Sequence, residues 1–358
     1  NQYRTYGFLS ASMCSMAIKA KTLAYAASPL FNSTQNPILG YTDGNAQERW
    51  KLAAKALKEV IDLDPSKLHL YSDFEKLFII QPNQNPEYIV YTGNPKSYIL
   101  ELYNYPPSLL GSGGTCPSHN LVSAFEKIDG SANDMQSDNQ FENMDSRFNA
   151  TIIYDGCTLG ARGEINISDP NSQDAIGKIN LRSTVTGYYL RKFLDTNINL
   201  SAQSITNTYH YFPVIRLADI YLLYAEAMNE AYGPNDAADL GLTALDALNK
   251  VRDRAGITTR YTTTSQAEME KKIRNERRVE LAFEDQHYFD LRRWKVAEKD
   301  LNQPLMGFRI ERQDGGAASA HEFVVDGQRK FNTKMYYSPI PYSEMQLNTN
   351  LVQNPGWR

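Results

Sequence analysis

Small and apolar residues recur at helical spacing near the start of the chain. Between residues 12 and 31 they lie three and four positions apart, and Pro29 marks the end of the helix that they predict. A second apolar stripe runs through residues 48–65 and is closed by Pro65. The pattern predicts two antiparallel helices. The alanines of the second helix are typical of a tetratricopeptide repeat, where small residues let paired helices approach closely.

A similar pair of helices is predicted in the second half of the chain. Residues 214–232 and residues 236–255 each carry an apolar stripe, and Gly256 supplies a C-cap signal after the second. A further helix is predicted over residues 265–285, where Ser265 with a glutamate three positions later forms a capping box. These segments together predict a mainly α-helical protein.

The segments between the helical blocks lack this periodicity. Residues 74–102 and 147–200 have short apolar runs that Asn, Pro and Gly interrupt. Short strands are expected at residues 87–91 and 97–103. We interpret most of the remainder as irregular structure that lies on the helices, and loops of this length are usually functional or disordered.

Composition narrows the classes of partner. The chain has 358 residues, of which 42% are hydrophobic and 22% charged, as in ordinary globular proteins. It has 37 basic and 41 acidic residues, so no excess of positive charge would hold a nucleic acid. No run approaches the roughly 20 apolar residues that cross a bilayer. We therefore expect neither a nucleic-acid partner nor a membrane-spanning helix.

The cysteines and histidines form no recognisable site. Cys14, Cys116 and Cys157 are odd in number and show no CxxC spacing, so they define neither a disulfide framework nor a zinc site. Cys14 falls in an Ala- and Met-rich helical pattern and is expected to be a small core residue. Five histidines share no metal-ligand spacing: His69, His119, His210, His287 and His321.

The chain also lacks the common catalytic motifs. It has no HExxH, GxSxG, Walker A or GxGxxG sequence. The glycine-rich residues 111–114 lack the P-loop lysine and are interpreted as a flexible loop. The acidic and amide-rich residues 131–145 could offer oxygen ligands to calcium, but their spacing departs from the EF-hand and favours a solvated loop. We expect no catalytic residue, no metal site and no cofactor. A glycosidase needs only two carboxylates in one cleft, so this alternative stays open.

A dense run of charge covers residues 273–294. Its arginines and acidic residues balance, and the pairs Glu270–Arg274 and Arg277–Glu280 have helical spacing. We interpret this run as a structural, salt-bridged helix, in preference to a nucleic-acid surface.

Tyrosine is the most informative side chain. The chain has 23 tyrosines, and many lie in polar loops with Asn, Pro and Gly. A tyrosine ring combines an apolar face with a hydroxyl group, which suits partners such as sugars that are apolar on one side and wet on the other. The alternative is that these tyrosines only cover a loop-rich surface.

Several of these segments resemble the SusD/RagB family. Four long blocks resemble its C-terminal half in the right order, namely FPVIRLADIYLLYAEAMNE at residues 212–230, ALDALNKVRDRAGI at 244–257, IRNERRVELAFEDQHYFDLRRW at 273–294 and YYSPIPYSEMQLNTNLVQNPGW at 336–357. Residues 119–130 and 144–156 are similar to the family's middle segments, so the resemblance covers nearly the whole chain.

The resemblance implies a fold and its division. It implies a mainly α fold of the SusD-like α/α superhelical type, with tetratricopeptide-like helix pairs that support a long irregular region with a few short strands. Residues 1–358 would form one unit. Within it, residues 1–65 would be a tetratricopeptide-like helix pair, residues 66–211 a loop-rich ligand-binding region, and residues 212–358 the C-terminal helical region.

The resemblance also implies a function without catalysis. Members of the family bind oligo- or polysaccharide at the extracellular face of the outer membrane and deliver it to a SusC-like, TonB-dependent transporter. They carry a lipid anchor and further helices before the first helix seen here, so we expect membrane attachment only through an N-terminal anchor absent from this sequence. Peptide capture, as in RagB-like uptake proteins, is the alternative.

The candidate site lies in a variable segment between the helical blocks. Glycan contacts in similar proteins come from aromatic and polar loop residues, and the corresponding segment here is residues 97–120. Tyrosine rings would serve as stacking platforms, and an amide and an imidazole as hydrogen-bond partners. These candidates are Tyr98, Tyr103 and Tyr105 for stacking, and Asn104 and His119 for hydrogen bonding.

Overall fold

The protein is mainly α-helical, as predicted. The computed structural model describes residues 5–357 except residues 94, 136–139, 178–179 and 312–318. Its α-helices are α1 (Ala11–Ala27), α2 (Pro29–Asn32), α3 (Ala46–Ile61), α4 (Ile99–Asn104), α5 (His119–Val122), α6 (Ser146–Thr151), α7 (Leu217–Tyr232), α8 (Ala244–Arg254), α9 (Gln266–Glu280), α10 (His287–Arg293), α11 (Ala297–Asp300) and α12 (Tyr342–Leu347). None of the helices described is both long and apolar enough to cross a membrane.

Seven short strands accompany these helices in the described part of the chain. They are β1 (Thr5–Phe8), β2 (Tyr88–Gly93), β3 (Ile152–Ile153), β4 (Tyr189–Leu190), β5 (Tyr211–Arg216), β6 (Leu305–Glu311) and β7 (Ser319–Asp326). They form a three-stranded sheet in the order β1-β2-β5 and the two-stranded pairs β3-β4 and β6-β7.

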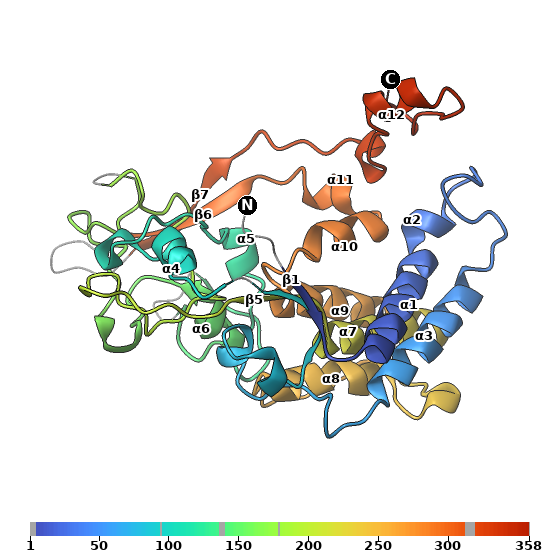
Figure 1. Ribbon diagram of the computed structural model, residues 1–358, viewed down its shortest axis with the longest axis horizontal. Helices are drawn as coiled ribbons and strands as arrows, with labels where there is room; N and C mark the ends of the chain where they lie inside the picture. Colours follow the sequence, from blue (N-terminus) through green and yellow to red (C-terminus); the bar gives the residue numbers. More distant parts are fainter. Residues whose placement is uncertain (1–4, 94, 136–139, 178–179, 312–318, 358) are drawn as a thin grey trace.

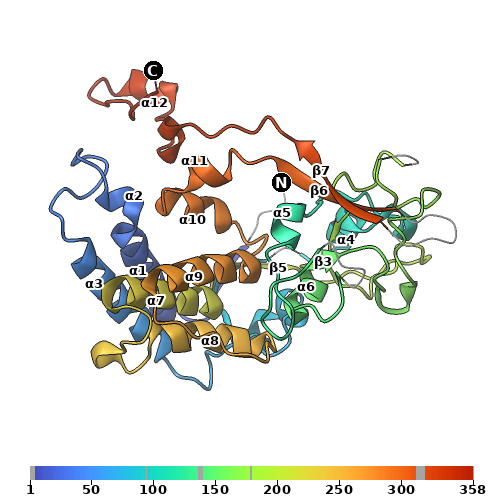
Figure 2. The ribbon, with the colours of Figure 1, turned by 180° about the vertical axis from the view of Figure 1, so that it is seen from behind.

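The long helices pack together at one end of the molecule. Figures 1 and 2 show α1, α3, α7, α8 and α9 side by side, with α7 in contact with the other four. Ala17, Ala20 and Ala24 on α1 and Ala53 and Ala54 on α3 are fully buried, so the two backbones approach closely. The predicted pairs α1–α3 and α7–α8 are therefore present. Cys14 is only half-buried, so the expectation that it fills the core is wrong, because alanines occupy that face.

The helix boundaries differ from the predicted ones for local reasons. Helix α7 begins at Leu217 because the preceding residues form β5. Helix α8 begins at Ala244, where the Thr243 side chain accepts a hydrogen bond from the backbone N–H of Asp246. Helix α9 begins after Ser265, as predicted, but it ends at Glu280. The helix is capped at Leu281, and the chain then turns away, with a φ of 63° at Phe283.

One strand prediction is confirmed and the other is wrong. Strand β2 covers all but the first of the predicted residues 87–91, and it pairs with β1 and β5. Pro213 is tolerated in β5 because β5 lies at the edge of the sheet. Residues 97–103 form no strand: Ile99 to Tyr103 lie in α4, and Ser97 forms an isolated bridge with Thr208. In α4, Glu101 and Asn104 are buried while Tyr103 is exposed, a spacing that suits a helix better than a strand.

The β6-β7 hairpin was not predicted. It interrupts the C-terminal region that was expected to be helical, and it extends over the loop-rich half of the molecule (Figure 1). Strand β6 contacts α5, and Phe308 of β6 is buried against the His119 ring, with 4.7 Å between ring centroids. The hairpin therefore covers part of the segment that was expected to bind ligand.

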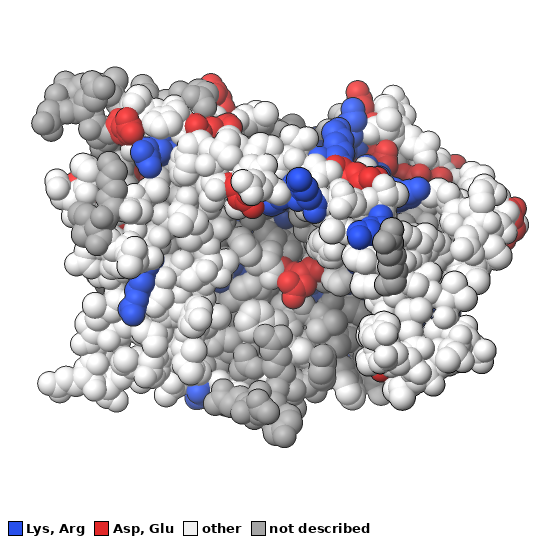
Figure 3. Space-filling model, turned by 90° about the horizontal axis from the view of Figure 1, so that it is seen from above, with Lys and Arg blue, Asp and Glu red and all other residues white. Residues whose placement is uncertain are grey.

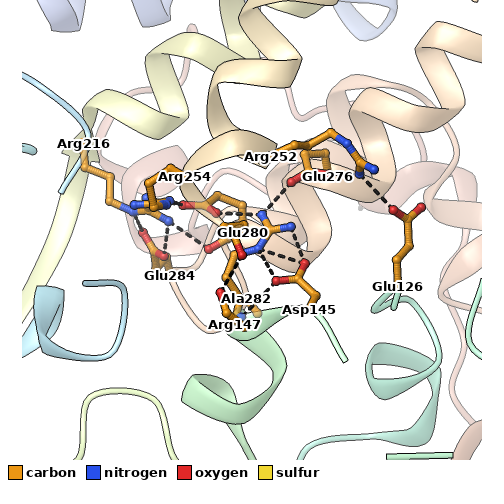
Figure 4. Close-up of polar contacts among 12 residues, drawn as sticks. Glu126, Asp145, Arg147, Arg216, Arg252, Arg254, Glu276, Glu280, Ala282 and Glu284 are labelled. Atoms are coloured by element: carbon orange, nitrogen blue, oxygen red, sulfur yellow. Dashed lines mark hydrogen bonds and ion pairs between the residues drawn. The ribbon is translucent and has the colours of Figure 1, made fainter. Parts of the chain in front are cut away.

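Ion pairs within the protein explain the charged run at residues 273–294. The structural role of this run is confirmed. Most of its ion pairs, however, are buried and join segments that are distant in the sequence (Figure 4). The Glu270–Arg274 pair forms on the surface of α9 as predicted. The Arg277–Glu280 pair does not form. Arg277 binds Asp219 and Asp290 instead, each at 2.9 Å. Glu280 binds Arg147 and Arg216, which come from outside the helix.

Candidate ligand-binding site

Helix α4 brings two of the five candidates, Tyr103 and Asn104, to one pocket. The pocket has a volume of about 440 Å³, and its wall combines exposed apolar groups with polar ones. It is lined by Pro95, Ser97, Ile99, Leu100, Tyr103, Asn104, Gly114, Thr115, His210 and Phe212. We call it the Tyr103 pocket.

Tyr103 offers its ring to solvent. The residue is 66% exposed, which is unusual for so large an apolar surface beside a pocket. The backbone of Gly114 lies close to it, since the Gly114 N–H donates a hydrogen bond of 2.7 Å to the Tyr103 carbonyl oxygen. The backbone of Tyr103 is therefore held at Gly114, while much of the side chain is open to solvent, as stacking on a ligand requires.

Asn104 supplies an unused hydrogen-bond acceptor. Its side chain is buried, and its Nδ2 donates to the Leu100 carbonyl oxygen at 2.9 Å. Its Oδ1 atom is also buried but has no hydrogen-bond partner among the described residues. Buried polar atoms are nearly always paired, so an unpaired acceptor on a residue that lines a pocket is unusual.

His210 is a pocket residue that the sequence interpretation missed. Its Nε2 lies 2.8 Å from Oε1 of Glu101, and both side chains are buried. The same oxygen accepts a hydrogen bond from the Asp195 backbone N–H. Glu101 therefore holds His210 at the pocket from a position 109 residues earlier in the sequence. No local motif signals this contact.

Two further candidates support α4 and do not line the pocket. Tyr105 is 1% exposed, and its hydroxyl group donates to the Asp195 carbonyl oxygen at 2.7 Å. Burial raises the pKa of Tyr105 well above the ordinary value for tyrosine. Tyr98 is half-buried and packs against the same apolar cluster, which contains Leu194 and Ile198. Tyr105 in particular has no free face for stacking, contrary to its predicted role.

His119 lies elsewhere in the structure. It is 2% exposed, its Nδ1 lies 3.0 Å from the Tyr188 hydroxyl oxygen, and its Nε2 lies 3.3 Å from Oε1 of Glu322. Burial lowers its pKa, although the neighbouring Glu322 carboxylate acts in the opposite direction. The structure therefore places His119 in a core under the β6-β7 hairpin, away from the lining of the Tyr103 pocket.

The glycine-rich residues 111–114 pack against α4. The Gly113 N–H donates to the Tyr105 carbonyl oxygen at 3.1 Å, in addition to the Gly114 bond described above. A Cβ atom added at Gly111 would lie 2.0 Å from the Tyr105 carbonyl oxygen. These glycines permit a close approach of two backbones, whereas the sequence had suggested a flexible loop.

A larger pocket shares one lining residue with the Tyr103 pocket. It has a volume of about 610 Å³, and Phe212 lines it as well as the Tyr103 pocket. Its wall includes Lys21 and Tyr25 of α1 and Phe289 of α10. Lys21 is already bound to Asp219 at 2.8 Å, so its charge is satisfied within the protein.

No group of three or more His, Cys, Asp or Glu side chains in the described part of the chain could hold a metal ion. Residues 136–139, within the acidic loop considered for calcium, lie outside the described residues. All three cysteines are free thiols. Burial raises the pKa of Cys157 to about 11, which disfavours the reactive thiolate.

Comparisons with known proteins agree with this architecture. The sequence model of the SusD family matches residues 80–357. The SusD-like protein P25 of Formosa agariphila is 32% identical over 157 residues, which are 40% of this chain and 24% of that protein.

Two solved structures from Bacteroides fragilis share the fold. A SusD-like carbohydrate-binding protein has a TM-score of 0.74 at 23% identity, over 96% of this chain and 65% of its own. A SusD-like protein has a TM-score of 0.74 at 22% identity, over 97% of this chain and 65% of its own. The chain therefore spans less than two thirds of the length of these relatives. Since the family match extends over most of the sequence, this chain belongs to the SusD family.

Proposed function

We propose that the protein binds oligo- or polysaccharide in the Tyr103 pocket, without making or breaking covalent bonds. The observation that carries this proposal is the exposed ring of Tyr103 beside the unpaired Oδ1 of Asn104 in one pocket. A sugar ring can stack its C–H face on the tyrosine and donate a hydroxyl hydrogen bond to the amide oxygen. The similarity to a carbohydrate-binding protein of B. fragilis supports this choice of ligand.

The binding step would serve uptake. SusD family proteins are surface-associated binding proteins, and we infer lipid anchoring at the extracellular face of the outer membrane. The captured glycan would then pass to a SusC-like, TonB-dependent transporter. A binder that must release its ligand needs only moderate affinity, with dissociation constants of roughly micromolar to millimolar, or about −8 to −4 kcal/mol.

Affinity electrophoresis against a panel of plant, microbial and host polysaccharides tests the proposal. We expect at least one glycan to retard the protein, and the Tyr103→Ala variant to lose the retardation. The Tyr342→Ala variant is the matched control, because Tyr342 is 74% exposed but lies on α12, outside the pocket lining. Equal retardation of both variants and the wild type would remove the site assignment.

Two other functions are outcomes of the same experiment. Retardation by no glycan, with binding of extended peptides instead, would favour peptide capture. New reducing ends after incubation with a glycan would favour hydrolysis, which requires two carboxyl groups roughly 5 to 10 Å apart in one cleft.

A further inference from the structure

Arg278 differs from the fully buried arginines of this protein. Those arginines each form an ion pair with at least one carboxylate, and they are Arg147, Arg216, Arg252, Arg277 and Arg293. Arg278 follows Arg277 on α9 and is partly buried. Among the described residues it has no carboxylate oxygen within 4 Å and makes no side-chain hydrogen bond, although Asp300 and Arg329 are close enough to affect its pKa. Arg278 therefore has guanidinium donors that no group in the described part of the protein uses.

Arg278 lines a pocket of about 500 Å³ with a second guanidinium group. The pocket lies where α5, α9, α10 and α11 meet the segment after β7, and it also contains His287, Asp300 and Arg329. One Nη atom of Arg329 donates to the Gln303 carbonyl oxygen at 2.6 Å. Its Nε is buried and has no partner among the described residues. Two cationic groups with unused donors therefore share one pocket, which we call the Arg278 pocket.

The electrostatics of this pocket favour an anion. Burial and the nearby Arg329 lower the pKa of Arg278, while the Asp300 carboxylate opposes the shift. Arginine nevertheless stays charged in proteins. Burial and the charge of Arg278 lower the pKa of His287 to about 4, so at neutral pH its imidazole is uncharged and can donate one hydrogen bond. Asp300 is exposed, and it is the one carboxylate in the lining against two guanidinium groups.

Figure 3 shows basic and acidic side chains interspersed on the upper face, which is hollowed near the middle of the view. A mixed surface of this kind has no general affinity for anions, so selective binding of an anion would need a specific pocket. The forked guanidinium group is suited to that task because it can bind two oxygens of one oxyanion at once.

We propose that the Arg278 pocket binds an oxyanion, either a sulfate ester or a carboxylate carried by the ligand. The Arg278 pocket and the Tyr103 pocket share no lining residue, so the anion site is a separate structural feature. Anion binding itself does not depend on the proposed function. Only the identity of the carrier, an acidic glycan, rests on it.

Inorganic sulfate tests the site directly. Thermal unfolding would be followed in sodium sulfate and in sodium chloride of equal ionic strength, for the wild type, Arg278→Gln and Arg182→Gln. Arg182 is the control because it is exposed and lies outside the pocket. Sulfate stabilises any protein by exclusion from its surface, so the relevant quantity is the difference between variants. We expect the unfolding temperature of the wild type and of Arg182→Gln to rise more with sulfate concentration than that of Arg278→Gln, because only the first two proteins gain the stabilisation from binding at the site.

Sodium acetate, used in the same way, distinguishes a carboxylate site from a sulfate site. Equal responses of all three proteins to both anions would overturn the proposal. Arg329→Gln is the second variant, and it should also weaken the response. In sodium chloride, Arg278→Gln should not unfold earlier than the wild type, because no ion pair is lost. If Arg278→Gln unfolds at a lower temperature than the wild type in chloride and responds to sulfate as the wild type does, Arg278 only supports packing.

Calorimetry with oligosaccharides tests the carrier. A sulfated oligosaccharide, its desulfated counterpart and a uronate oligosaccharide would be compared. Arg278→Gln should weaken binding of the charged ligand about tenfold and leave the neutral one unchanged. If no oligosaccharide binds but inorganic sulfate still stabilises the wild type selectively, the proposed function fails while the anion site stands. Unchanged affinity of Arg278→Gln for every charged oligosaccharide would overturn the assignment of the carrier.

Discussion

The Nη1 atom of Arg216 lies 2.6 Å from Oε1 of Glu280, and neither side chain is more than 1% exposed. Arg216 is the last residue of β5, and Glu280 is the last residue of α9. Arg216 also binds Glu87, which precedes β2, at 2.6 Å (Figure 4 shows the pair with Glu280 within the wider network). These ion pairs therefore join the sheet that carries Phe212 to the helical half of the molecule.

The Arg216→Gln variant should lose much of its stability. Removing one cation from a buried network leaves carboxylates without compensation, which typically costs about 3–5 kcal/mol. Unfolding in urea would measure the change. Lys51→Gln is the control because Lys51 pairs with Glu48 at the surface, where ion pairs contribute little. Similar losses in the two variants would show that the buried network does not stabilise the fold.

Stability should depend on the protonation of Glu230 on α7. Burial, with the nearby Glu270 and Glu226 carboxylates, raises its pKa to about 7. A carboxyl group whose pKa is higher in the folded state than in the unfolded state stabilises the fold below the unfolded pKa of about 4.5. That stabilisation is lost as the pH rises through 7.

Replacement of Glu230 by Gln removes this dependence. The difference in unfolding free energy between Glu230→Gln and the wild type should shift in favour of the variant by about 1–3 kcal/mol from pH 4.5 to pH 8. Each unit of pKa shift corresponds to about 1.4 kcal/mol, and partial exposure reduces the effect. Urea unfolding of both proteins at the two pH values measures the gain. A difference between the proteins that is the same at both pH values would contradict the expected titration.

Much of the helical architecture could be predicted because its signals are local. The alanines of α1 and α3 and the stripe of α7 recur every three or four residues, and tertiary packing follows the same faces. Helix α4 was taken for a strand because six residues cover less than two turns, too few for a periodicity to show. The hairpin β6-β7 was missed because few of its side chains are buried, so no strict alternation of apolar residues marks it.

The site could be predicted only in part for a related reason. Tyr103 and Asn104 were identified because they are neighbours in a segment rich in aromatic and polar residues. His210 reaches the same pocket through a pairing with Glu101, and Arg278 meets Arg329 only in the folded chain. In the sequence, Arg278 cannot be distinguished from the paired arginines near it on α9. Such contacts depend on tertiary structure and leave no spacing in the sequence.

The Tyr105→Phe variant separates support of the site from contact with the ligand. It removes the hydroxyl group that donates to the Asp195 carbonyl oxygen and leaves the buried ring in place. We expect a loss of about 1 kcal/mol in the free energy of unfolding, with glycan affinity close to that of the wild type. Urea unfolding and calorimetry measure the two quantities. A large loss of affinity at unchanged stability would instead place the Tyr105 hydroxyl in contact with the glycan.

Gly114→Ala should weaken ligand binding through Tyr103. A Cβ atom at this position would lie 2.7 Å from Cδ1 and from the carbonyl oxygen of Tyr103, closer than such atoms approach in proteins, so the ring or the backbone must move. Gly327→Ala is the matched control, because its Cβ would meet Val324 at an ordinary 3.6 Å. Calorimetry with the glycan that retards the wild type should show weaker binding for Gly114→Ala alone. If Gly114→Ala binds as tightly as Gly327→Ala, the position of the Tyr103 ring does not determine affinity, and the ligand must contact another part of the protein.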